Sequence, residues 1–179
     1  MKKLLLMTIA LAVTSCAKPT PKASEAPANL IREAIGVAGV ELGMTPTEVE
    51  AKRGKPVRQN AQDGHVVFMS FHKEENFGVY FDPVTSRVRM IIASVKDKTW
   101  CTDFDVCLYR EGDLSKLKTH HGDKLLRFVD RDGSVTYRLL GNKGADTVMT
   151  EYTPSEAHNG VVQVTIMNWT GPITQSSFD

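Results

Sequence analysis

Cysteines and histidines are the side chains with the widest chemistry in this sequence, and their spacing limits what they can do. Cys101 and Cys107 stand with five residues between them. Two thiols at this spacing could form a disulfide, act as a redox pair or hold a metal. The spacing is not that of the usual redox motif, and no histidine lies at metal-ligand spacing from either cysteine. We therefore predict a structural disulfide, which stabilises so short a loop by about 2 kcal/mol.

The other candidates for catalysis or metal binding do not combine into a site. His120 and His121 end a predicted helix, where adjacent side chains point about 100° apart and a histidine favours the helix dipole. Asp103 and Asp105 offer too few oxygen ligands for a calcium loop. The sequence has no nucleophile elbow, phosphate-binding glycine loop or zinc-hydrolase helix. It predicts a non-enzymatic protein with no catalytic residue, cofactor or metal.

The third cysteine ends an N-terminal targeting segment. Two lysines precede an apolar run over residues 4–13, which is the pattern of a secretory signal. The run is about half as long as a bilayer-spanning helix. The sequence Val13-Thr14-Ser15-Cys16 resembles the lipobox of bacterial lipoproteins, in which the cysteine is lipidated and becomes the N-terminus.

This resemblance implies a lipoprotein signal peptide over residues 1–15 and acyl chains, palmitate among them, on Cys16. The alternative is an ordinary signal peptide cleaved near Ala17. Several acyl chains hold a protein stably to a membrane. In this family an aspartate after the cysteine commonly marks inner-membrane retention, and the alanine found here implies the outer membrane, facing the periplasm. Residues 16–28 carry three prolines among small and polar residues, which predicts a flexible tether.

Composition agrees with a soluble globular domain beyond the tether. The chain has 179 residues, of which 41% are hydrophobic and 24% charged, and its formal net charge is +1. It has no sustained run of lysine or arginine. Nucleic-acid binding is therefore not predicted, because phosphate recognition needs clustered cations.

The rest of the sequence describes one unit twice. Thr45 begins a capping box and Gly54 ends the segment, which predicts a helix over Pro46–Arg53. Asp113, a second N-cap type, stands 68 residues after Thr45, and Gly122 stands 68 residues after Gly54. The spacing predicts that the helix recurs.

Strands recur in the same way. Asp-Gly turn signals precede residues 65–71 and 134–140, and later β-prone runs align at shifts that grow to 74 residues. A further helix is predicted over residues 28–35. The expected fold is α+β, with two tandem units of short helices packed on an antiparallel β-meander, forming a curved sheet. The predicted divisions are a first unit at 29–97, a second at 98–171 and a C-terminal tail at 172–179.

Residues 40–49 (VELGMTPTEV), followed by Gly54-Lys55-Pro56, resemble the opening motif of the β-lactamase-inhibitor-protein-like fold. The small lipoprotein subunit of the outer-membrane β-barrel assembly machinery also uses that fold, in which a helical pair packs on an antiparallel sheet. A tandem of two units is more similar to the inhibitor protein. The second copy departs at residues 109–112. Members of this family mostly bind other proteins and share no active site.

Alternation assigns one sheet face to the helices and leaves the other for a partner. The face predicted to be covered carries Val88, Met90, Ile92, Val162, Val164 and Ile166. The opposite face carries the candidate partner surface, namely Arg87, Arg89, Arg138, Gln163, Thr165, Met167 and Trp169. Tryptophan and arginine dominate binding hot spots, and methionine adapts to irregular surfaces. The alternative is that these residues form only the solvated side of an antiparallel sheet.

The sequence therefore predicts a lipid-anchored, periplasm-facing protein-binding or scaffold module of the cell envelope. Its predicted partners are the membrane, which it contacts through lipidated Cys16, and an envelope protein that the sequence does not identify. The resemblance offers an alternative, a proteinaceous inhibitor of a periplasmic or extracellular hydrolase. An enzyme built on the same fold is a third possibility, but no residue pattern in the sequence supports it.

Overall fold

The computed structural model describes residues 29–71, 76–94, 99–155, 157 and 159–170. The predicted signal peptide, Cys16, the tether and the C-terminal tail lie outside the described residues. None of the helices it describes is both long and apolar enough to cross a membrane.

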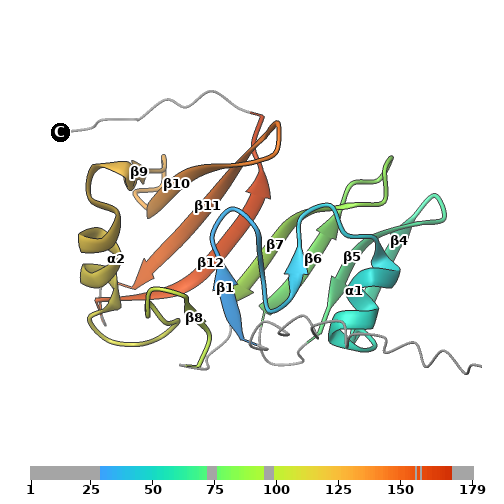
Figure 1. Cartoon of the computed structure of the whole chain (residues 1–179), viewed down its shortest axis with the longest axis horizontal. Helices are drawn as coiled ribbons and strands as arrows, with labels where there is room; N and C mark the ends of the chain where they lie inside the picture. The colour runs from blue at the N-terminus through green and yellow to red at the C-terminus, as the bar shows by residue number, and fades with distance from the viewer. Residues whose placement is uncertain (1–28, 72–75, 95–98, 156, 158, 171–179) are drawn as a thin grey trace, which may run out of the picture.

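An eight-stranded sheet forms the body of the molecule (Figure 1). Its strands stand in the order β4-β5-β6-β7-β12-β11-β10-β9, and all neighbours are antiparallel. The first half of the sheet comprises β4 (Arg58–Gln62), β5 (His65–Ser70), β6 (Asn76–Phe81) and β7 (Val88–Ser94). The second half comprises β9 (Leu126–Val129), β10 (Val135–Lys143), β11 (Asp146–Ser155) and β12 (Gly160–Asn168). The halves meet where β7 pairs with β12.

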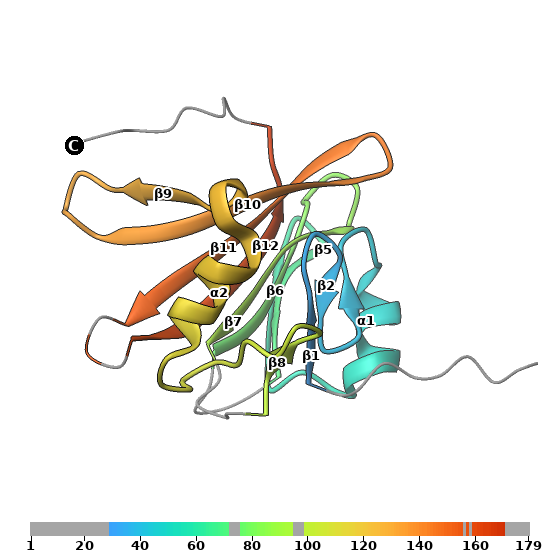
Figure 2. The same cartoon turned by 60° about the vertical axis from the view of Figure 1, so that its left-hand side comes forward.

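One face of this sheet is covered by all the remaining elements (Figure 2). A four-stranded sheet lies there, with strands β3 (Val40–Glu41), β2 (Gly36–Val37), β1 (Leu30–Arg32) and β8 (Cys101–Thr102) in that order. It is joined by α1 (Pro46–Arg53), α2 (Asp113–His121) and the 3-10 turn η1 (Gly122–Lys124). Val49 of α1, Leu117 of α2 and Ile31 of β1 share one apolar core with the large sheet.

The expected α+β fold of two short-helix-on-meander units is wrong. The described chain is mostly β, with a four-stranded and an eight-stranded sheet. The helix expected over residues 28–35 is replaced by β1 and a turn in which Ala34 has a φ of 55°. A Cβ on Gly36 would lie 2.0 Å from the carbonyl oxygen of Val40. Glycine therefore allows β2 and β3 to pair tightly, and this contact competes with a helix.

At α1 the prediction from local sequence signals is confirmed. Its bounds match the predicted helix, and the capping box is present: the Glu48 amide donates to Thr45 Oγ1 at 3.3 Å, and the Thr45 amide donates to Glu48 Oε2 at 2.7 Å. At α2 the expected cap is wrong, because Gly112 holds the N-cap position and Asp113 is the first helical residue.

A β-bulge in β7 changes which residues face the core. The pairs on either side of the bulge are Tyr80 with Met90 and Phe81 with Val88. Arg89 is the extra residue, so Val88 and Ile91 are both buried on the covered face. Met90 and Ile92 are turned to the other face, which makes their prediction wrong. In β12, Val164 and Ile166 are buried as predicted, and Val162 is half-buried.

Candidate partner-binding site

The face of the large sheet opposite α1 and α2, called here the open face, carries an aromatic pair. Phe68 of β5 and Tyr80 of β6 are direct cross-strand partners, and their ring centroids lie 4.8 Å apart. A Cβ on the neighbouring Gly78 would lie 3.0 Å from the Phe68 ring. The missing side chain thus leaves room for the ring to lie over β6.

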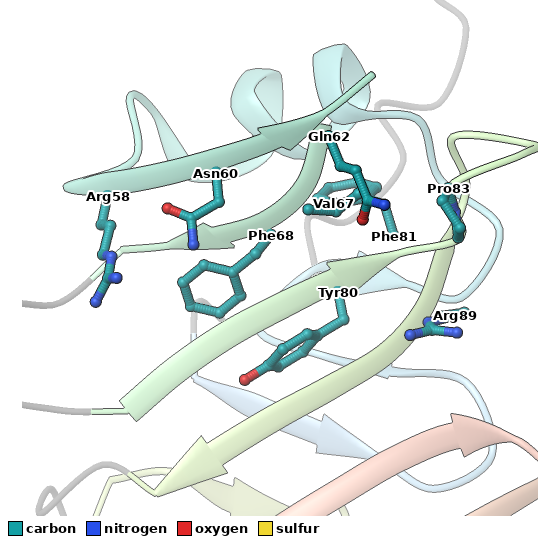
Figure 3. Close-up of a pocket in the computed structure, with 9 residues that line it drawn as sticks. All are labelled: Arg58, Asn60, Gln62, Val67, Phe68, Tyr80, Phe81, Pro83 and Arg89. Carbon is teal, nitrogen blue, oxygen red and sulfur yellow. The ribbon is translucent and has the colours of Figure 1, made fainter. Parts of the chain in front are cut away.

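This pair forms the floor of a shallow depression of about 490 Å³ (Figure 3). β4 contributes side chains along one side, and the bulge in β7 contributes Arg89 on the other. The described residues that line the depression are Arg58, Asn60, Gln62, Val67, Phe68, Tyr80, Phe81, Pro83 and Arg89. They include two arginines and no carboxylate.

Both arginines of the depression are exposed, and neither forms an ion pair with another described residue. The charge of Arg89 affects the pKa of one nearby carboxylate, that of Asp82. Hydrogen bonds from Thr85 chiefly lower the pKa of Asp82, and Arg89 adds a smaller effect. The depression thus offers positive charge above an aromatic floor. Such a site suits a carboxylate next to an apolar side chain.

A smaller hollow of about 190 Å³ continues the depression toward the middle of the sheet. It shares Phe68 and Tyr80 with the depression and reaches Ile92 of β7 and Gln163 of β12. The two hollows therefore join the first half of the open face to the seam between the halves.

The second half of the open face is closed by its own contacts. Arg138 and Glu151 are cross-strand partners on β10 and β11, and Arg138 Nε donates to Glu151 Oε2 at 2.6 Å. The Arg138 guanidinium also lies 4.2 Å from the centroid of the Phe128 ring. These charges satisfy one another and leave less for a partner.

The predicted partner surface is divided by the structure. Arg89 lines the depression, Arg138 is held in its ion pair, and Gln163 lines the smaller hollow. Arg87 is directed elsewhere, because its Nη1 donates to the carbonyl oxygen of Gly43 at 2.9 Å. Sequence alternation therefore misplaced Arg87.

The other three predicted residues follow the seam and the end of β12. Thr165 is buried and accepts a hydrogen bond from the Gln163 amide at 3.4 Å. Met167 is half-buried opposite Met90. Trp169 is half-buried as well, and its indole nitrogen is buried with no hydrogen-bond partner among the described residues.

Sequence reasoning missed Arg58, Phe68 and Tyr80. The strands that carry the aromatic pair were expected, but residues 65–71 are apolar on both alternations. The pattern therefore could not show which side of β5 faces the core. A second bulge, at Val67 opposite Asn60 and Ala61, also changes which side chains of β5 face the core.

The structure does gather polar residues on the covered face. The buried Tyr152 hydroxyl donates to Glu33, and His121 Nε2 lies 2.9 Å from the same carboxylate oxygen. Burial, followed by the nearby charge of Glu33, raises the pKa of Tyr152 well above its ordinary value. The cluster ties the β1–β2 turn to α2 and β11. His120 stacks on Phe104 with centroids 4.0 Å apart, and its ring also meets the His121 ring edge-on, with centroids 4.7 Å apart.

The predicted disulfide between Cys101 and Cys107 is confirmed. The side chain of Asp105 lies close enough to form a three-residue metal-ligand group with the two sulfurs, but the joined sulfurs carry no free thiolate. Asp105 instead accepts hydrogen bonds from Arg110 Nη1 at 3.0 Å and Lys116 Nζ at 3.2 Å. The Arg110 bond is the main reason that the pKa of Asp105 is lowered.

One exposed pair has the residue types of a catalytic dyad. His65 Nδ1 lies 3.1 Å from Ser86 Oγ. No carboxylate in the described part of the chain bonds the other ring nitrogen of His65, so the pair lacks the group that orients a catalytic base.

Comparison with protein-family models gives no match for this chain, and comparison with curated proteins gives none either. Among solved structures, the chain is similar to a cysteine-rich secretory protein from Staphylococcus aureus, with a TM-score of 0.47 and 12% identity. The likeness covers 71% of this chain and 43% of that one. It is too distant to bear on function.

Proposed function

We propose that the protein is a non-catalytic binding module of the bacterial cell envelope, held to the outer membrane through lipidated Cys16 and facing the periplasm. It binds a protein partner through the first half of the open face. The observation that carries this proposal is the Phe68–Tyr80 pair flanked by Arg58 and Arg89, with no lining carboxylate to neutralise them. The lipobox and the tether support the location.

Binding energetics favour this half of the face. Tyrosine and arginine are enriched in hot spots, where an anchor side chain is desolvated in a small pocket and surrounded by polar residues. Here the aromatic floor has the amides of Asn60 and Gln62 at its rim. In the second half, by contrast, a partner would have to compete with the bond between Arg138 and Glu151.

A second candidate function is inhibition of a periplasmic or extracellular hydrolase. The aromatic pair supports it, because an inhibitor must offer aromatic or acidic side chains across its sheet rather than a wholly polar face. Inhibition of a purified envelope hydrolase, lost on replacing Tyr80, would select this candidate over a scaffold.

Photocrosslinking in the native envelope tests the binding site. A photoreactive phenylalanine analogue at Tyr80 of the full chain is expected to capture one discrete protein. The same analogue at Ser115, exposed on α2 of the covered side, is the matched control and should capture none. Charge reversal with Arg89→Glu should reduce the Tyr80 product. Equal capture at both positions, or none at Tyr80, contradicts the proposed site.

The anchor is tested separately by the Cys16→Ser variant. It should leave the membrane fraction after a high-salt wash, whereas the wild-type chain stays. Retention of the variant with outer membranes would show that the protein is held there in another way.

A further inference from the structure

The strand β4 is an open edge of the large sheet. In the described chain it pairs with β5 only, and all five of its residues are exposed. An edge strand presents unpaired backbone groups that another strand can join, and natural edges are often blunted by lysine, proline or a bulge. β4 contains no lysine or proline, and the bulge opposite Asn60 and Ala61 lies in β5, at Val67. A regular edge remains from Arg58 to Asn60.

The opposite edge, β9, is less accessible. It has four residues, of which only Arg127 is exposed. Its Phe128 lies under the Arg138 guanidinium. The two edges of one sheet therefore differ in exposure, and β4 is the one that can receive an added strand.

The side chains of β4 determine which side chains on an added strand would be complementary to this edge. Arg58, Asn60 and Gln62 project over the depression (Figure 3). Side chains of an added strand would lie directly opposite these residues, within about 5.5 Å between Cβ atoms. A carboxylate opposite Arg58 would form a charge-assisted hydrogen bond with its guanidinium.

We propose that β4 binds an extended acidic segment of a protein partner, which adds to the sheet as a ninth strand beside Arg58–Asn60. Backbone hydrogen bonds hold the segment, and an acidic side chain on it faces Arg58. In strand addition of this kind, the backbone hydrogen bonds supply affinity for many sequences, and the alternate side chains supply specificity. The inference rests on the proposed function and names the form of the partner segment.

The test uses the full chain in detergent and two capped heptapeptides, one alternating valine with glutamate and one alternating valine with lysine. Fluorescence anisotropy should show that the glutamate peptide binds at least tenfold more tightly. Hydrogen–deuterium exchange should slow over β4 and stay unchanged over β9. Arg58→Ala should weaken binding about fivefold, the size of one exposed charge-assisted contact. Arg131→Ala, which removes an exposed arginine from the second half, should leave binding unchanged.

Backbone pairing is tested with N-methylated glutamate peptides. Only alternate amides of an added strand face the edge. Methylation of one alternating set should therefore abolish binding, and methylation of the other set should preserve it. Equal effects of both sets, or binding with no protection of β4, would overturn strand addition.

The two proposals fail in different ways. If neither peptide binds while Tyr80 still crosslinks an envelope protein, strand addition is wrong and the proposed function stands. If Tyr80 captures no protein, the proposed function fails whatever the peptides do.

Discussion

The two halves of the large sheet hold the same kind of position with opposite chemistry. The second and third strands from one edge place Phe68 against Tyr80, and those from the other edge place Arg138 against Glu151. The first pair is aromatic and lies between two arginines that form no ion pair with another described residue. The second pair satisfies its own charges at 2.6 Å. The second half thus pairs its charges internally, whereas we propose that the first half binds a partner.

The next residue along each of these strands, Phe81 after Tyr80 and Tyr152 after Glu151, lies on the covered face and shows a similar difference between the halves. Phe81 of β6 and Tyr152 of β11 are both buried. The Tyr152 hydroxyl donates to Glu33, and this bond ties the second half to the β1–β2 turn. Polar contacts thus gather in the second half on both faces, which makes that half the better place to look for stability effects.

The largest expected effect is loss of partner binding when the aromatic pair is removed. Phe68→Ala combined with Tyr80→Ala should weaken binding about thirtyfold or more, since hot-spot truncations cost about 2 kcal/mol or more. The binding is measured with the crosslinked partner once it is purified. Arg138→Ala combined with Glu151→Ala is the matched control in the second half and should change affinity less than about threefold, like most interface residues outside a hot spot. A larger loss in the control would reverse the comparison.

Stability should show the opposite order. Glu151→Ala leaves Arg138, whose side chain is 21% exposed, without its carboxylate. The free energy of unfolding should fall by about 2 kcal/mol, the usual cost of a lost charge-assisted hydrogen bond at a partly buried site. Arg58→Ala, at an exposed position, should change it by less than about 0.5 kcal/mol. Urea denaturation compares the two, and equal losses would remove the distinction between the halves.

Alkaline pH should destabilise the protein through Tyr152. Its pKa is raised in the folded state, so its contribution to stability is fully present below the unfolded pKa of about 10 and declines as the pH rises above it. The slope is at most about 1.4 kcal/mol per pH unit. Tyr152→Phe should remove this part of the decline between pH 9 and pH 11, measured by urea denaturation, and Ser115→Ala should retain it. An unchanged slope in Tyr152→Phe would contradict the role of its burial.

The smallest effect concerns salt. Raising the ionic strength from 0.05 to 0.5 M should weaken partner binding about threefold, because exposed charges are screened. The double variant Arg58→Ala with Arg89→Ala should lose most of this sensitivity. If the variant stays as salt-sensitive as the wild type, charges elsewhere attract the partner.

Local features of the fold could be predicted from the sequence. The helix α1 follows from a cap, a first-turn proline and a terminal glycine within ten residues. The Asp63-Gly64 turn between β4 and β5 has positive φ at both residues, 50° and 80°, as its sequence indicates. The pairing of Cys101 with Cys107 follows from their short separation. Each of these signals acts between residues that are close along the chain.

The candidate site could be predicted only in part, because its residues come from five strands. Arg89 and Gln163 were expected on the open face and line its hollows, whereas Arg58 and the aromatic pair were missed. Two bulges set the faces of β5 and β7, and a bulge depends on how neighbouring strands pair.

Tertiary structure also decided the small sheet. The sequence predicts a helix over residues 28–35, but β1 pairs with β8, about 70 residues away in the chain. That contact, together with the close approach at Gly36, outweighs the local preference. The sequence alone thus determined the cap of α1, the Asp63-Gly64 turn and the disulfide, whose causes are local. Contacts between distant segments decided which arginines form an ion pair within the described structure, such as Arg138, and which do not, such as Arg58 and Arg89.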